Sequence, residues 1–161
     1  SKAIRDWWGW GKWAAAAINK VLKAVPKKAK AAVHLCFGNY GGQSIQKGTW
    51  AKLMDYLNAL KVDHIVMETA HRPPEELAVF KELRKDIGLG LGVVDIKRTE
   101  IESPSDIARA IERGEKLLGK DRIRYVHPDC GFWMLPRNVA DGKIRALPAG
   151  RDLYEGRSAK P

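Results

Sequence analysis

The sequence predicts an α/β fold in which repeated βα units surround a parallel sheet. From Ala31 onward, short apolar runs alternate with longer amphipathic stretches, which is the order expected of parallel strands joined by helices. Each run is almost continuously apolar, as strands buried on both faces are. The runs begin about 30 residues apart, which is the length of a βα unit. The expected strands are residues 31–37, 62–68, 89–96 and 123–126.

The segment before the first strand predicts an amphipathic helix over residues 4–22. Its large apolar residues recur at spacings of three or four, so they form one stripe along a helix. A stripe of this width predicts packing against the core or against a surface that covers it from outside. Its members are Ile4, Trp7, Trp10, Trp13, Ala17 and Val21.

The segments between the strands carry helix start signals. Thr49 is expected to cap a helix that runs through about Leu60, and Pro73 and Pro74 precede two acidic residues, an opening that suits a helix N-terminus. Ser103 is expected to cap the third helix, with a proline at its first position and an acid in its first turn. A weaker helix is expected over residues 138–147. The chain is thus expected to comprise an N-terminal helix and basic linker (1–30), a main α/β unit (31–150) and a tail (151–161).

Composition narrows the functional class. The chain has 161 residues, of which 45% are hydrophobic and 30% charged, which excludes a disordered or low-complexity protein. No apolar run approaches the roughly 20 residues of a membrane span, and no signal peptide is recognisable, so the expectation is a cytoplasmic chain without membrane contact and with reduced thiols. The net charge of +10 raises the possibility of nucleic acid. The densest positive stretch, residues 20–30, has lysines as its only charged residues and no aromatic residues between them. The preferred interpretation of this stretch is therefore a solvated helix end and linker.

Polar residues of metal-binding type follow the predicted strands. They are His34 and Cys36, then Glu68, then Asp95, then Cys130. Sites in parallel α/β sheets gather at the carboxyl ends of the strands, so these residues are expected to form one site.

A zinc ion is the expected occupant of this site. His34 and Cys36 lie two positions apart, so their side chains point to the same face of a strand. With Glu68 and Cys130 they form a set of one imidazole, two thiolates and one carboxylate, which suits tetrahedral zinc. Copper is the softer alternative, but the carboxylate favours zinc. A single His-x-Cys pair is more often part of a core, so the prediction depends on the combination. Asp95 does not match any of these metal ligands. It is expected either to contact the metal ligands or the substrate, or to cap its own loop.

Several segments resemble the catalytic barrel of cobalamin-independent methionine synthases, in the same order and spacing. The matching segments are His34-Leu-Cys36-Phe-Gly-Asn, Met67-Glu68-Thr-Ala, Gly92-Val-Val-Asp95-Ile-Lys, Glu102-Ser and Pro128-Asp-Cys130-Gly-Phe. The resemblance implies that His34, Cys36, Glu68 and Cys130 bind zinc, which activates the thiol of homocysteine for methylation. It also implies a TIM (β/α)8 barrel, of which this chain supplies the C-terminal half, about four βα units.

The resemblance implies a methyltransferase that forms methionine from homocysteine, with a methylated folate or a methylcorrinoid protein as the methyl donor. Two alternatives stay open: zinc-dependent alkyl transfer to another thiol such as coenzyme M, and a non-catalytic zinc-binding subunit that uses its basic face for an acidic partner. Half a barrel leaves strand edges unpaired. A second chain that supplies the N-terminal half of the barrel is therefore expected, with self-association as the fallback.

Overall fold

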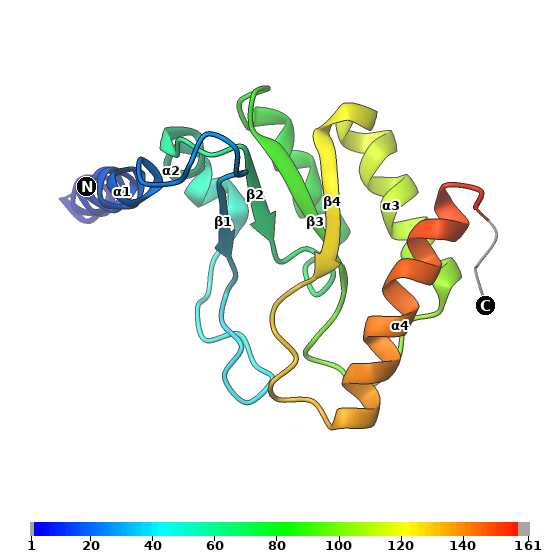
Figure 1. Cartoon of the computed structure of the whole chain (residues 1–161). Coiled ribbons are helices and arrows are strands. Elements are labelled where there is room, and N and C mark those ends of the chain that lie inside the picture. The colour runs from blue at the N-terminus through cyan, green and yellow to red at the C-terminus, as the bar shows by residue number, and fades with distance from the viewer. Residues whose placement is uncertain (1, 158–161) are drawn as a thin grey trace.

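The computed structural model describes residues 2–157, with side chains from Gly11 onward. Within this part of the chain, four strands form one parallel sheet in the order β1-β2-β3-β4 (Figure 1). The strands are β1 (Ala32–Leu35), β2 (His64–Met67), β3 (Gly88–Val94) and β4 (Ile123–Pro128). Each strand pairs in parallel with the next along the chain, so the predicted α/β fold of four βα units is confirmed.

The two faces of the sheet differ in their burial. In β2, Ile65 and Met67 are fully buried, whereas His64 and Val66, which point to the opposite face, are only partly buried. The buried face contacts the helices, and the other face lacks such a cover among the described residues. The prediction of strands buried on both faces therefore holds for β3 alone.

The inner face of β3 carries glycines, and side chains from β4 and the loop after it occupy the space. A side chain at Gly88 would meet Arg124, one at Gly90 would meet the His127 ring, and one at Gly92 would overlap the Asp129 carboxylate. Because these glycines have no side chains, the side chains of β4 and of the loop after it can extend across the centre of the sheet.

The helical segments begin where their start signals predict. The 3₁₀ turn η1 (Trp50–Leu53) leads into α2 (Met54–Ala59), and η2 (Pro74–Glu82) begins at the predicted proline. Thr49 occupies the position before η1, but its side chain makes no capping hydrogen bond. The η2 segment is a 3₁₀ helix. In α3 (Pro104–Leu118), Ser103 is the N-cap as predicted. It forms a capping box with Asp106, in which each side chain accepts a hydrogen bond from the other's backbone N–H. A further 3₁₀ turn, η3 (Lys120–Arg122), precedes β4.

The last helix, α4 (Arg137–Tyr154), is longer than predicted and contains Pro148. Proline and the following Gly150 are local stop signals, but α4 packs along α3, and a Cβ at Gly150 would overlap Ile107. Close packing between the two helices thus outweighs the local signals. The first residues of the segment expected to be a tail, 151–154, are helical.

The first helix, α1 (Lys2–Leu22), projects from one side of the molecule (Figure 1). Its end is attached to α2 through Asn19, whose side chain donates to the Ala59 carbonyl at 2.8 Å and accepts from the Lys61 N–H at 2.7 Å. Ala15 is buried at this contact.

The predicted apolar stripe of α1 lies on a different face. Trp13 is 67% exposed and Val21 72% exposed, so packing of this part of the stripe against the chain's own core is contradicted. The reason is geometric, because Ala15, Ile18 and Leu22 supply the face that contacts the core. The side chains of Ile4, Trp7 and Trp10 lie outside the described residues. Along residues 2–157, the helices are too short or too polar to cross a membrane.

Candidate metal centre

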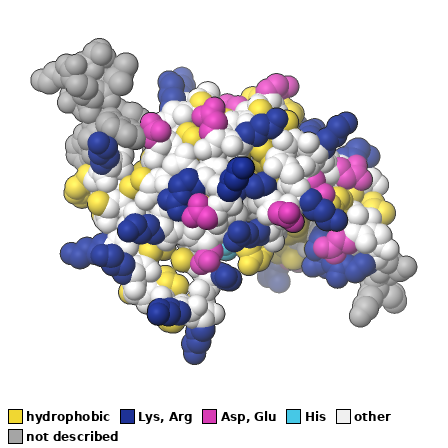
Figure 2. All heavy atoms as spheres, turned by 90° about the horizontal axis from the view of Figure 1, so that it is seen from above, with side chains coloured by type: hydrophobic (Ala, Val, Ile, Leu, Met, Phe, Trp, Pro, Cys, Tyr) yellow, Lys and Arg dark blue, Asp and Glu magenta, His cyan; other side chains and the backbone are white. Residues whose placement is uncertain are grey.

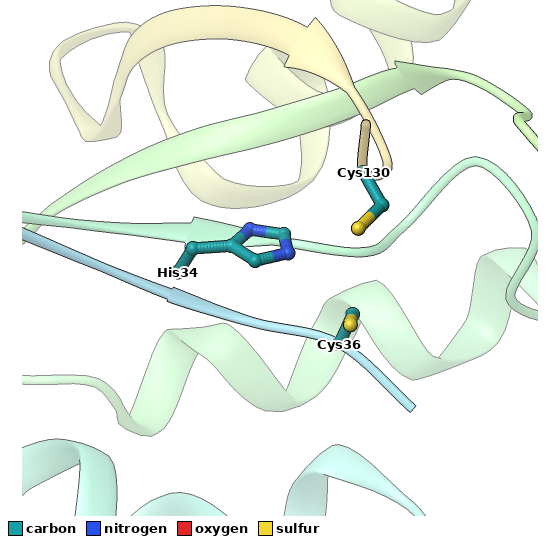
Figure 3. A group of neighbouring side chains, drawn as sticks. All are labelled: His34, Cys36 and Cys130. Atoms are coloured by element: carbon teal, nitrogen blue, oxygen red, sulfur yellow. The ribbon is translucent and has the colours of Figure 1, made fainter. Parts of the chain in front are cut away.

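Three of the predicted ligands meet at the carboxyl end of the sheet. His34 lies on β1, Cys36 follows it directly, and Cys130 follows β4, so the first and last strands of the sheet both contribute (Figure 3). One ligand atom of each, the imidazole nitrogen and the two Sγ atoms, lies within 4.8 Å of the others. This spacing is suitable for side chains around one ion after small adjustments.

The chain after Cys36 turns immediately away from the sheet. Gly38 has a φ of 103°, a left-handed conformation that favours glycine, and a Cβ there would lie 3.0 Å from the Ile45 backbone nitrogen. The loop that follows reaches the loop after β4, where Asn39 donates to the Gly131 carbonyl at 3.1 Å. This contact brings the Cys36 and Cys130 segments together.

Asp129 fixes the position of the neighbouring Cys130. Its fully buried carboxylate accepts hydrogen bonds from three successive backbone N–H groups after β2: those of Thr69 and Ala70 at 2.8 Å, and that of His71 at 2.7 Å. Burial raises the pKa of Asp129 to about 6 and outweighs the opposing effect of these donors. Asp129 is therefore engaged by backbone amides and not by the three cluster residues.

Without a metal, the cluster favours neutral ligands. Burial, followed by the nearby His127, lowers the pKa of His34. Burial raises the pKa of Cys36, and Cys130 adds to this effect, while the Gly38 backbone N–H opposes it. A bound cation reverses this preference for thiols, because coordination favours the thiolate.

Glu68 lies beside the cluster, at the end of the neighbouring strand β2, and outside the three-residue group. Its side chain is fully buried, and its Oε2 accepts a hydrogen bond from the Phe37 N–H at 3.0 Å. The same oxygen lies 3.1 Å from the Lys97 ammonium. The other oxygen, Oε1, has no hydrogen-bond partner among the described residues. One carboxylate oxygen is thus held and the other is left unpaired.

Asp95 is engaged in its own loop. Its Oδ1 accepts from the Lys97 N–H at 2.8 Å, and its Oδ2 lies 2.9 Å from His71 Nδ1. Asp95 and His71 line a cavity of about 660 Å³ between η2 and α3, and the three cluster residues are not among the described residues that line it. Of the two roles expected for Asp95, capping of its own loop is supported by a direct contact, the hydrogen bond from the Lys97 N–H.

Sequence reasoning missed two buried lysines. The Lys97 side chain is 2% exposed and pairs with Glu68, and Lys143 in α4 is fully buried and pairs with Glu102 at 2.9 Å. Glu102 also accepts from the Asp95 N–H at 2.9 Å, so this second pair supports the loop after β3. Lysines in loops and polar helix stretches are normally solvated, and the sole signal for Lys97 was its position two residues beyond Asp95 at a strand end.

Parallel βα units with a His-Cys-Cys cluster at the carboxyl ends of the strands define a class: α/β proteins that can hold a metal ion through thiolates and an imidazole. The chain matches the family model described as the cobalamin-independent synthase catalytic domain over residues 2–148. It therefore belongs to this family, as the resemblance predicted.

Curated relatives agree with this assignment, and a solved structure has the same fold. The chain is 32% identical over 144 residues to a methionine synthase of Thermococcus kodakarensis, covering 89% of this chain and 39% of that protein. It is 33% identical over 137 residues to a methionine synthase of Pyrococcus horikoshii, covering 85% of this chain and 36% of that protein. A B12-independent methionine synthase from Shewanella, solved in complex with selenomethionine, shares the fold at a TM-score of 0.70 and 24% identity, over 90% of this chain and 43% of that chain.

The chain thus spans roughly two fifths of the length of these relatives. Its four strands correspond to part of a larger barrel, in agreement with the predicted half-barrel.

Proposed function

We propose that this chain is the zinc-binding half of a methyltransferase that transfers a methyl group to the thiol of homocysteine and so forms methionine. The observation that carries the proposal is the convergence of His34, Cys36 and Cys130 at the carboxyl end of the sheet. The family assignment supports methionine formation as the reaction.

Glu68 is the fourth ligand in this proposal. Its unpaired Oε1 is a buried acceptor without a partner among residues 2–157, and buried acceptors are seldom left in that state unless an ion or water meets them. Imidazole, two thiolates and one carboxylate are a donor set that zinc accepts. The residues present therefore fit the metal.

When bound, zinc stabilises a substrate thiolate as a Lewis acid and lowers the fraction of protonated thiol at neutral pH. The protein groups orient and confine the reactants. Asp129 fixes the loop that bears Cys130, and Gly38 turns the chain away so that the face of Cys36 stays accessible. In the reaction, the homocysteine thiol releases its proton to solvent, and the sulfur forms the new S–CH₃ bond with its own electron pair. The bond between the donor and the methyl carbon breaks, and its electron pair stays on the donor.

The donor is a methylated folate or a methylcorrinoid protein. Large apolar side chains in the loops around the cluster are exposed, which suits a surface that a substrate or partner covers. They are Tyr40, Ile45, Trp133 and Met134, and each is at least 41% exposed.

The partner in this proposal supplies the remaining strands of the barrel. The outer edges of β1 and β4 carry no neighbouring strand among the described residues, and unpaired strand edges are usually covered in proteins. The exposed Trp13 and Val21 on α1 add apolar surface that a neighbouring element would bury.

Metal analysis tests the site. Protein purified without chelator should contain about one zinc per chain or per assembled barrel, and Cys36→Ser and Cys130→Ser should each reduce this content strongly. His64→Gln, at the start of β2, is the matched control and should retain zinc. Unchanged zinc in both cysteine variants would remove the basis of the proposal.

An acceptor assay tests the reaction. With the partner half and a methyl donor present, homocysteine should be methylated faster than coenzyme M. Methylation of coenzyme M but not of homocysteine would show that coenzyme M is the acceptor.

A second candidate function has one observation in its favour. Figure 2 shows lysines and arginines spread over the end of the molecule where the strands begin, opposite the metal centre. A zinc-binding subunit that recognises an acidic partner would use this end. Acidic residues lie between these basic residues, as in the ion pair of Arg84 with Asp86 at 2.5 Å. They weaken the uniformly positive potential that recognition of an acidic partner needs.

A further inference from the structure

Lys97 is an unusual residue at this position. Its side chain is 2% exposed, although lysine is almost never buried without a specific partner. Its recorded partner is Glu68 Oε2 at 3.1 Å, and the ammonium makes no hydrogen bond of good geometry within the described part of the chain. The ion pair with Glu68 therefore accounts for its burial.

The contacts of Glu68 are divided between its two oxygens. Oε2 faces Lys97 and the Phe37 N–H, both of which stabilise negative charge on that atom. Oε1 has no partner among the described residues. Cys36, a member of the metal cluster, follows β1 directly, and the register of β1 with β2 places it beside Glu68.

We propose that Lys97 is a positioning residue that makes Glu68 the exchangeable ligand of the metal centre. This inference rests on the proposed zinc site. Lys97 and the Phe37 N–H hold Oε2 in place, so only Oε1 is available to the metal. The ammonium also draws charge away from the carboxylate, which weakens its bond to a cation.

The same arrangement provides a resting place for the carboxylate once it leaves. A catalytic zinc site needs a position that a substrate thiolate can occupy. A carboxylate released in a buried site is costly unless a charge partner is present. Lys97 is that partner, so the exchange of Glu68 for a substrate sulfur creates no unpaired buried charge.

A neutral substitution separates this role from a structural one. Lys97→Met keeps the length and the apolar stem of the side chain but removes its charge. We expect Lys97→Met to bind zinc more tightly, by a factor of about 10, a change similar in size but opposite in sign to the loss that usually follows removal of a residue that contacts a metal ligand. Lys97→Arg keeps the charge and should restore the original affinity. Chelator competition on the whole chain measures these affinities. A purely structural role predicts equal or weaker zinc binding for Lys97→Met, and that result would overturn the proposal.

Cobalt spectroscopy supplies a second measurement that does not depend on catalysis. In Co²⁺-loaded protein, added homocysteine should increase the sulfur-to-cobalt charge-transfer absorption. Lys97→Met should need a several-fold higher thiol concentration for the same increase, because its carboxylate leaves less readily. An equal thiol requirement in both proteins would also overturn the proposal.

Glu68→Gln shows whether Lys97 acts through Glu68. In a Glu68→Gln background, Lys97→Met should change zinc affinity far less than it does in the wild type, since the carboxylate is gone. An undiminished effect would place the action of Lys97 elsewhere. Failure of the zinc site itself is distinguishable, because the wild type would then bind neither zinc nor cobalt through its cysteines.

Discussion

Asp129 connects the end of β2 to the loop that carries Cys130, through three backbone N–H groups. Asp129→Ala leaves these buried donors without an acceptor, and donors to a charged group contribute about 1.5–3 kcal/mol each when the bond is lost. We expect the free energy of unfolding to fall by about 3–5 kcal/mol in urea denaturation, less than the sum of three such bonds, because the alanine variant also removes the desolvation cost of the buried carboxylate.

Asp129→Asn is the matched variant. It keeps one acceptor oxygen for Thr69 and Ala70 but presents an N–H₂ group to the His71 N–H, so an intermediate loss is expected. A loss below about 1 kcal/mol for the alanine variant would show that water replaces the carboxylate at little cost.

At the residue scale, the sequence was sufficient to predict which side chains converge but not how each is held. His34, Cys36 and Cys130 come together because the carboxyl ends of parallel strands meet. Glu68 lies next to them, but its ion pair with Lys97 depends on how the loop after β3 folds back. No local pattern encodes that fold-back, so the position of Lys97 at a strand end did not predict its pairing with Glu68.

The N-terminus of α3 offers a test at the level of one element. Ser103 and Asp106 form a capping box, and Ser103→Ala removes one half of it. The expected loss of stability is about 1 kcal/mol near neutral pH, measured by thermal or urea unfolding.

This contribution should depend on pH with a defined sign. Hydrogen bonds from Ser103 lower the pKa of Asp106 below its ordinary value of 3.8, so the cap stabilises the fold fully above that value. As the pH falls through the lowered pKa, the carboxylate is protonated and the stabilisation is lost. The difference between wild type and Ser103→Ala should therefore shrink below about pH 4. A constant difference down to pH 2 would assign the effect to the serine alone.

The contact between α3 and α4 depends on the absence of a side chain at Gly150. A Cβ there would overlap Ile107 and lie 3.0 Å from the Pro104 carbonyl oxygen. Gly150→Ala should destabilise the fold by about 1–3 kcal/mol, because the helices must move apart. Gly11→Ala is the control of opposite sign. Among the described residues, no atom beyond its own stretch of helix backbone lies within 4 Å of a Cβ at Gly11, and alanine favours a helix over glycine by about 1 kcal/mol.

The start of α3 was predictable because its capping box acts locally, whereas the end of α4 was not. Pro148 and Gly150 are stop signals in any isolated segment, and packing against α3 overrides them. The apolar stripe of α1 shows the same limit. Its spacing predicts a helix correctly, but the face that packs is Ala15, Ile18 and Leu22 rather than Trp13 and Val21.

At the scale of the whole molecule, strand edges and apolar side chains lie uncovered among the described residues. The edges of β1 and β4 and the exposed residues of α1 and the site loops predict association with the other half of the barrel. Sedimentation of the isolated chain should show self-association, and addition of the partner half should convert it to a one-to-one complex.

A charge on the exposed stripe tests the same surface. Val21→Lys should weaken this association, whereas Lys61→Ala, on the connection after α2, should not. A stable monomer of 18.0 kDa that binds zinc and methylates homocysteine unaided would show the partner to be unnecessary.

Because the cluster draws on β1 and on the loop after β4, the residues between Cys36 and Cys130 make up more than half of the chain. An ion bound to both cysteines would turn that stretch into a closed ring. Polymer theory assigns such a closure an entropy that corresponds to about 4.7 kcal/mol for a ring of about 100 residues. The ion would therefore act on the unfolded chain as well as on the folded one, by removing its most expanded conformations. Refolding that starts from a zinc-loaded denatured state would begin with the two ends of the sheet already tied together.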